Sequence, residues 1–364
     1  MQILCRMKII ETIGRVSGCA LLGLLLLVTS CVPHDRYVTV SGYAQGGTYS
    51  VKFNLNGSNG MISQSPEAIK DSIDCILQAI DESLSGYNKN SLVSSFNAGK
   101  DIVPDGLFVD MYNLSYKIYL QTDGAVDVAA APLYDIWGFG FKSGEMPDDA
   151  LVLATMKNCG MSRLLEDMSE AIASDGVLSP GNLLSEKGTA LPALNYNAVA
   201  QGYSCDMVAK YLYGLGVRDM MVNIGEIFCD GVNPSGKPWT IGIDTPEDGN
   251  NELGASVHAV FQVPSGPHGV VTSGNYRKFY VRDGKKYAHT VDPRTGYPVS
   301  HNLLSATVVA SDATLADAYA TYCMVIGLEA SKVFLESTEG IEGCLVYDDD
   351  GKFGTWTSSG MQLL

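Results

Sequence analysis

Apolar residues recur along this chain with two different periods. Between residues 69 and 84, isoleucine and leucine return every three or four positions, which predicts a helix with one apolar face. Similar periodicity predicts three more helices, one beginning after Gly202 and one ending before Gly327; they cover residues 107–122, 203–215 and 314–326.

Other segments alternate with a period of two and are rich in β-branched residues, which predicts strands. Residues 38–55 form an expected hairpin that turns at Gly46-Gly47, and residues 277–291 form another that turns at Asp283-Gly284. Further strands are expected at 220–224, 239–244, 255–263 and 303–310. Because strands and helices mix without a regular strand–helix–strand rhythm, the pattern favours one compact α+β domain over residues 38–364.

The first thirty residues have the pattern of an export signal. Basic residues precede an apolar stretch at 19–28, which is shorter than the roughly 20 residues that span a membrane. The stretch ends in Leu-Val-Thr-Ser-Cys, which is similar to a bacterial lipobox. We therefore expect residues 1–30 to be a lipoprotein signal peptide and Cys31 to carry lipid. Residues 31–37 would tether the domain to a bacterial membrane on its periplasmic side; a short transmembrane anchor is the alternative.

The charge of the chain limits its partners. A net charge of −16 at pH 7 argues against nucleic acid, whose phosphates need a basic surface. An anionic ligand would need a metal, a helix N-terminus or backbone amides. The cysteines that follow Cys31 contain no Cys-x-x-Cys pair, so no zinc site is expected; they are Cys75, Cys159, Cys205, Cys229, Cys323 and Cys344.

Asp317 and Thr321 are the most distinctive chemical pair. They lie four positions apart in a predicted helix, so both side chains leave the same helix face. The neighbouring residues are small or apolar, which indicates that this helix is buried. A buried carboxylate beside a hydroxyl suits a hard cation such as Mg²⁺. Hydrogen bonds are the alternative that the spacing alone favours, with Asp317 capping a neighbouring element and Thr321 bonding to its own helix.

Three other positions carry weaker signals. His289 lies at the expected end of a strand, where an imidazole either acts as a general base or hydrogen-bonds the turn that follows. Residues 195–202 form a loop of small residues that enters a helix, which can bring backbone groups close to a phosphate or a metal. Asp127 precedes Trp137-Gly138-Phe139-Gly140, a cluster that can hold a flat ring or form ordinary core and turn.

The order of these signals resembles that of the ApbE family, the FAD:protein FMN transferases, over residues 46–327. The last two motifs are the most specific of the series. In chain order the matching motifs are Gly-Gly-Thr-Tyr-Ser-Val at 46–51, Ser-Gly-Tyr at 85–87, Asp-Gly-Ala-Val-Asp at 123–127, Trp-Gly-Phe-Gly at 137–140, Gln-Gly-Tyr at 201–203, Thr-Ser-Gly-Asn-Tyr-Arg at 272–277, His-Thr-Val-Asp-Pro-Arg-Thr-Gly at 289–296, and Ala-Asp at 316–317 with Thr321.

The resemblance implies an α+β domain related to the T-fold, with a role for each matching residue. Asp317 and Thr321 match metal ligands, and Ala198 matches the residue that gives a backbone oxygen to Mg²⁺. His289 matches the proposed catalytic base. The positions that match FAD-binding residues are Gly46, Tyr87, Ala125, Val126, Asp127, Asn195, Gln201 and Val291.

The implied activity is the Mg²⁺-dependent transfer of FMN from FAD to a Thr or Ser hydroxyl of an exported flavoprotein, with release of AMP. Two alternatives need the same pocket: hydrolysis of FAD to FMN and AMP, and a lipoprotein that only binds FAD. The sequence departs from the family pattern at Gly46, where Met is usual, at Asn195, where Asp is usual, and at Gln201, where Lys or Glu is frequent. Gly225-Glu226 shortens a Gly-Gly-Glu motif, and Ala288 replaces a Ser.

Overall fold

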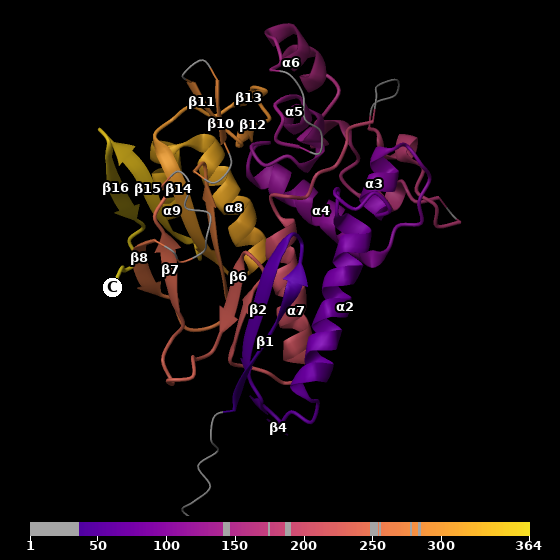
Figure 1. The fold of residues 1–364 in the computed structure, drawn as a ribbon. Coiled ribbons are helices and arrows are strands. Elements are labelled where there is room, and N and C mark those ends of the chain that lie inside the picture. The colour runs from indigo at the N-terminus through magenta and orange to yellow at the C-terminus, as the bar shows by residue number, and fades with distance from the viewer. Residues whose placement is uncertain are drawn as a thin grey trace, which may run out of the picture.

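The computed structural model describes residues 36–140, 146–173, 175–185, 191–247, 254, 256–276, 279–282 and 285–364 (Figure 1). The expected signal peptide, Cys31 and most of the tether lie outside these residues, as do Arg277 and the turn Asp283-Gly284. None of the helices in the described part of the chain is long and apolar enough to cross a membrane.

An eight-stranded antiparallel sheet forms the centre of the domain. Its spatial order is β1-β2-β5-β6-β9-β14-β15-β16, so strands from both ends of the chain complete one sheet. These strands are β1 (Tyr37–Ala44), β2 (Gly47–Asn54), β5 (Met220–Asn223), β6 (Ile227–Asp230), β9 (His268–Gly274), β14 (Leu303–Ala310), β15 (Glu342–Asp349) and β16 (Lys352–Thr357).

Four two-stranded ribbons accompany the sheet. They pair β3 (Asn56–Gly57) with β4 (Gly60–Met61), β7 (Thr240–Asp244) with β8 (Val257–Gln262), β10 (Phe279–Arg282) with β11 (Lys285–Ala288), and β12 (Val291–Asp292) with β13 (Tyr297–Pro298).

The α-helices vary widely in length. They are α2 (Pro66–Leu84), α3 (Leu92–Asn97), α4 (Gly106–Gln121), α5 (Ala131–Ile136), α6 (Asp149–Met156), α7 (Ala200–Gly214), α8 (Ala313–Ile326) and α9 (Leu328–Ser337). Short 3₁₀ helices occur at η1 (Val128–Ala130), η2 (Met161–Arg163), η3 (Met168–Glu170) and η4 (Pro180–Leu183).

Alternate side chains of the sheet pack against different layers. Val271 and Val308 point to α8 and α9, whereas their neighbours Val270 and Val309 point to the β7–β8 ribbon. At the other end of the sheet, α2 and α7 pack on β2 and β5, and Figure 1 shows these two helices beside the first hairpin. The sheet is therefore covered by helices on one side, and α7 and α8 are adjacent within that layer.

A second core lies away from the sheet. The aromatic residues Phe96, Phe108 and Tyr112 pack with Met161 and Met168 of the 3₁₀ segments. This core joins α3 and α4 to the irregular chain between α6 and α7. Because Val126, Val128 and Leu194 are part of it, it also holds in place the loops that approach α7 and α8.

The expected α+β architecture is confirmed, and so are most of the predicted elements. Helix α8 and strand β14 match the predicted ranges within one residue. The first hairpin turns at Gln45-Gly46 rather than at Gly46-Gly47. Both turn residues have positive φ, 52° and 82°, and two such residues give a turn whose twist matches that of paired strands.

The predicted start of α7 is wrong by three residues. The helix begins at Ala200, so Gly202 lies in its first turn instead of preceding it. Glycine is a poor helix former, which is why the sequence favoured a later start. The physical reason for the earlier start is a contact with α8.

Candidate active site

A cavity of about 300 Å³ lies between α7, α8, β9 and the loop that connects β11 to β12. Nearly all of the predicted site residues line this cavity, although they lie up to 234 residues apart in the chain (from 87 to 321). The predicted residues that line it are Tyr87, Ala125, Val126, Asp127, Asn195, Ala198, Gln201, His289, Val291, Asp317 and Thr321.

Gly46 is the exception among the predicted residues. It lines a neighbouring cavity of about 500 Å³, next to Gln45 in the hairpin turn. The two cavities share Tyr87, Asn197 and Gln201 in their walls. The two cavities are therefore adjacent, and Gly46 lies in the one that Asp317 does not line.

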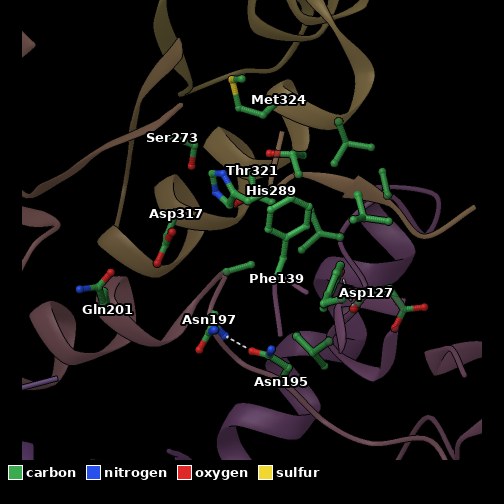
Figure 2. Close-up of a pocket in the computed structure, with 18 of the residues that line it drawn as sticks. Asp127, Phe139, Asn195, Asn197, Gln201, Ser273, His289, Asp317, Thr321 and Met324 are labelled. Carbon is green, nitrogen blue, oxygen red and sulfur yellow. Dashed lines mark hydrogen bonds between the residues drawn. The ribbon is translucent and has the colours of Figure 1, made fainter. Parts of the chain in front are cut away.

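Figure 2 shows Asp317, Thr321 and His289 grouped on one side of the first cavity, with Asn195 and Asn197 opposite. Asp317 and Thr321 come from successive turns of α8, as their spacing predicted. His289 comes from the segment between β11 and β12, so two separate parts of the chain form this group.

The N-terminus of α8 is held by two carboxylates. Asp312 caps the helix and accepts a hydrogen bond from the N–H of Leu315 at 2.8 Å. Asp206 of α7 accepts from the N–H groups of Ala313 and Thr314, at 2.8 Å each. Because Asp206 belongs to the neighbouring helix, these bonds fix the position of α8 relative to α7.

Asp317 makes the reverse connection, from α8 to α7. Its Oδ2 accepts a hydrogen bond from the N–H of Gly202 at 3.1 Å. That N–H lies in the first turn of α7. The residue at the cap position of this helix is Val199, whose side chain makes no capping hydrogen bond. A Cβ at position 202 would lie 2.3 Å from the carbonyl oxygen of Ala313, so only glycine allows the two helices to approach this closely.

The surroundings of Asp317 suit a hard cation. Its side chain is 5% exposed, and burial raises the pKa of the carboxyl to about 7. Among the described residues that line the cavity, none is Lys or Arg. The buried carboxylate of Asp317, the hydroxyl of Thr321 and the backbone carbonyl of Ala198 supply the oxygen ligands that Mg²⁺ prefers. The donor set thus fits the metal that the family resemblance implies.

His289 completes this group from outside α8. It is half-buried and follows Ala288, the last residue of β11. The Phe139 ring packs edge-on against the imidazole, with 6.4 Å between ring centroids. The next residue, Thr290, donates a hydrogen bond to the side chain of Asn275 at 2.8 Å, which fixes the chain just after the imidazole.

Asp127 reaches the cavity wall but directs its carboxylate into the backbone. The carboxylate accepts hydrogen bonds from the N–H of Ala129 at 2.9 Å and from the N–H of Met161 at 3.1 Å. It thereby caps η1 and joins it to η2. Burial raises the pKa of Asp127 to about 6 although both hydrogen bonds act to lower it.

This pKa predicts a pH-dependent contribution of Asp127 to stability. In the folded state the carboxyl of Asp127 binds its proton more tightly than a carboxyl with the ordinary pKa of 3.8 does. The protonated form therefore stabilises the fold fully below about pH 4, and this contribution is lost as the pH rises through about 6. The side chain of Asp127→Asn is neutral at every pH, so this variant should lose less stability than wild type between about pH 4 and pH 6.

Urea unfolding at pH 4.5, 5.5 and 7.5 measures the free energy of unfolding of both proteins. Asp175→Asn, at an exposed position, is the control. Parallel stability curves for wild type and Asp127→Asn would contradict the prediction.

The loop before α7 is ordered by its asparagines. Asn195 accepts a hydrogen bond from the N–H of Asn197 at 2.9 Å, which closes a tight turn (Figure 2). Asn197 in turn donates to the Tyr87 hydroxyl at 3.1 Å. The Tyr87 side chain is 64% exposed and stands between the two cavities. This turn places Ala198 against the first cavity.

Four residues at the site had no predicted role: Asp206, Asn197, Glu226 and Ser273. The last three line the first cavity, and Asp206 positions the helix that carries Asp317. All four lie within or beside the motifs that carry the resemblance, but their contacts depend on helix and strand packing that local spacing does not encode.

Comparison with known proteins places the chain in a class defined by this architecture. Residues 45–345 match the model of the ApbE family. The FAD:protein FMN transferase of Escherichia coli strain K12 is 31% identical over 310 residues, covering 82% of each chain. The corresponding protein of Klebsiella pneumoniae strain 342 is 29% identical over 352 residues, covering 93% of this chain and 94% of its own.

Solved structures are similar over the same range. The flavin transferase ApbE from Vibrio cholerae has a TM-score of 0.72 and 28% identity, over 89% of this chain and 98% of its own. The apo form of the Pseudomonas stutzeri flavinyl transferase ApbE has a TM-score of 0.73 and 28% identity, over 90% and 96%. The chain belongs to the ApbE family, and the resemblance seen in its motifs is confirmed.

Proposed function

We propose that this protein is an FAD:protein FMN transferase that links FMN covalently to a Thr or Ser hydroxyl of an exported flavoprotein. The observation that carries the proposal is the meeting of Asp317, Thr321, Ala198 and His289 at one cavity, from three separate parts of the chain. The family membership and the names of the similar proteins support the same activity.

The presence of two adjacent cavities supports FAD as the substrate. FAD is a long molecule of two nucleotide halves, and the two cavities offer separate places for them. The start of α7 lies between these places, since Ala198 lines the first cavity and Ala200 lines the second. The positive end of the α7 helix dipole, which lies there, favours a pyrophosphate. This local feature offsets the acidity of the whole chain.

The proposed reaction is a phosphoryl transfer. The acceptor hydroxyl oxygen attacks the phosphorus of the FMN half of FAD, and the bond from that phosphorus to the AMP oxygen breaks. The proton of the hydroxyl passes to His289 as the new phosphoester forms, and AMP leaves. His289 suits this role because it lines the cavity together with Asp317 and Thr321 and is only half-buried.

Asp317, Thr321 and the carbonyl of Ala198 would hold Mg²⁺. When bound, the ion supplies positive charge that offsets the charge of the pyrophosphate and of the leaving AMP. The chain contributes the rigid frame: Asp206 fixes α8, and Gly202 fixes the orientation of the Asp317 carboxylate.

Covalent labelling tests the proposal directly. The purified mature domain is mixed with FAD, Mg²⁺ and an exported flavin-carrier domain that bears a Thr acceptor. We expect a carrier band that fluoresces on a denaturing gel, because free FAD and FMN wash out and a phosphoester remains. Release of FMN without a labelled carrier would instead support the hydrolase, and bound FAD without turnover would support a binding protein.

We also propose that Cys31 anchors the protein by lipid to a bacterial membrane on its periplasmic side. The support is the lipobox-like sequence that ends at this residue. Cys31→Ser should abolish incorporation of radioactive palmitate and release the protein from the membrane fraction. Equal labelling of the two proteins, or of neither, would show that the assignment is wrong.

A further inference from the structure

Helix α9 has a second apolar face besides the one that packs on the sheet. Leu328 and Leu335 are buried in the core. Ala330 and Val333 lie on a different face, and Val333 is 69% exposed. Phe334 lies between the two faces and packs its ring on Tyr322 of α8. These three residues line an open groove whose other wall is the last turn of α8, formed by Tyr322, Val325 and Ile326. We call these six residues the α8–α9 groove.

The α8–α9 groove adjoins the active-site cavity. Val325 lines both of them, and α8, which forms one wall of the groove, also carries Asp317 and Thr321 of the cavity. The groove and the cavity therefore lie next to each other along the C-terminal half of α8.

The charged rim of the groove is internally neutralised. Arg294 donates two hydrogen bonds to the carboxylate of Asp292, each 2.9 Å long. In this two-bond geometry the guanidinium and the carboxylate neutralise each other's charge. The floor is apolar and the rim carries no net charge from this pair, so the groove suits an apolar side chain better than a charged one.

We propose that the α8–α9 groove binds an apolar side chain of the acceptor protein, close in sequence to the residue that receives FMN. This inference rests on the proposed transferase activity. That reaction requires a polypeptide segment to cross the cavity mouth so that its hydroxyl enters, and residues beside the hydroxyl then lie over the adjoining surface. In an extended segment successive residues are about 3.3 Å apart, which keeps a near neighbour of the acceptor residue within reach of this groove.

A second copy of this chain fits the groove less well. A stable dimer needs roughly 800 Å² from each partner. Within α9, Val333 is the single large apolar side chain that is mostly exposed. One such side chain provides a contact point for a peptide rather than the apolar area of a permanent interface.

The test replaces Val333 by residues of either charge. Val333→Asp and Val333→Lys lie on an exposed helix position, so both should fold. The matched controls are Val103→Asp and Val103→Lys, because the Val103 side chain is 68% exposed and lines neither the groove nor the cavities. Rates of FMN transfer are measured against the concentration of the Thr-bearing carrier domain, and FAD affinity is measured by titration calorimetry.

Both Val333 variants should raise the KM for the carrier about tenfold or more, because either charge opposes burial of the apolar partner. The kcat at saturating carrier and the affinity for FAD should stay unchanged, and the Val103 variants should match wild type. A wild-type KM in both Val333 variants would overturn the proposal. So would an effect of only one charge, a parallel loss of FAD affinity, or a wild-type dimer that sedimentation shows to be broken by Val333→Asp. A wild-type protein that labels no carrier would refute the transferase activity itself, and the groove proposal with it.

Discussion

Asp317→Asn is expected to reduce FMN transfer by about two to three orders of magnitude while the protein stays folded. The amide oxygen can still accept the hydrogen bond from Gly202, so the connection between α7 and α8 remains. The charge that would hold Mg²⁺ is lost. Because burial already raises the pKa of this carboxyl, a neutral residue should leave the stability of the metal-free protein unchanged or increase it. Initial rates across a Mg²⁺ titration and a thermal melt measure the two effects.

Asp317→Ala separates the two roles of the side chain. It removes the proposed metal ligand and also the cap on α7, so it should lose about 1 kcal/mol of stability in addition to activity. The Asn variant should match it in activity but not in stability. Unchanged Mg²⁺ dependence in Asp317→Asn would exclude Asp317 as a ligand, whatever happens to stability.

His289→Ala has the second large expected effect. Removing a general base lowers a rate by about two to four orders of magnitude. The half-buried imidazole lies between two short strands, so its loss should cost the fold little. FAD affinity should remain near that of wild type, since the cavity keeps its other walls. Single-turnover labelling of the carrier domain gives the rate, and calorimetry gives the affinity.

His258→Ala is a suitable control for this variant. His258 lies on β8 and hydrogen-bonds Thr355 of β16 at 2.7 Å, outside the cavity. Its replacement should leave the transfer rate at the wild-type value. Full transfer activity in His289→Ala would mean that another group takes the proton.

The sequence predicted which residues line the cavity better than it predicted the packing that positions them. Asp317 and Thr321 share a helix face because their spacing is a local property, and the α8 and β14 ranges followed from apolar runs with clear ends. Of the two interpretations of Asp317, the cap for a neighbouring element is observed, since the carboxylate caps α7, and the metal ligand stays a prediction. Spacing could not show this, because the amide it caps is 115 residues away.

The start of α7 shows why other predictions failed. Locally, Gly202 looks like a helix boundary, but Asp317 satisfies the N–H that a local cap would otherwise serve. The irregular chain at 157–199 likewise has little periodicity, and its 3₁₀ helices are held by tertiary contacts such as that of Asp127 with Met161. Helix α9 was not predicted because Gly327 ends α8 and also begins the next helix.

The close approach of Gly202 to Ala313 determines which changes the protein can accept. A library that randomises every position near the cavity should return glycine at 202, although that residue has no side chain to touch a ligand. Position 198 should tolerate many side chains, because its proposed contribution is a backbone oxygen. Redesign for another metal or acceptor should therefore leave the α7–α8 contact untouched and vary the residues around it.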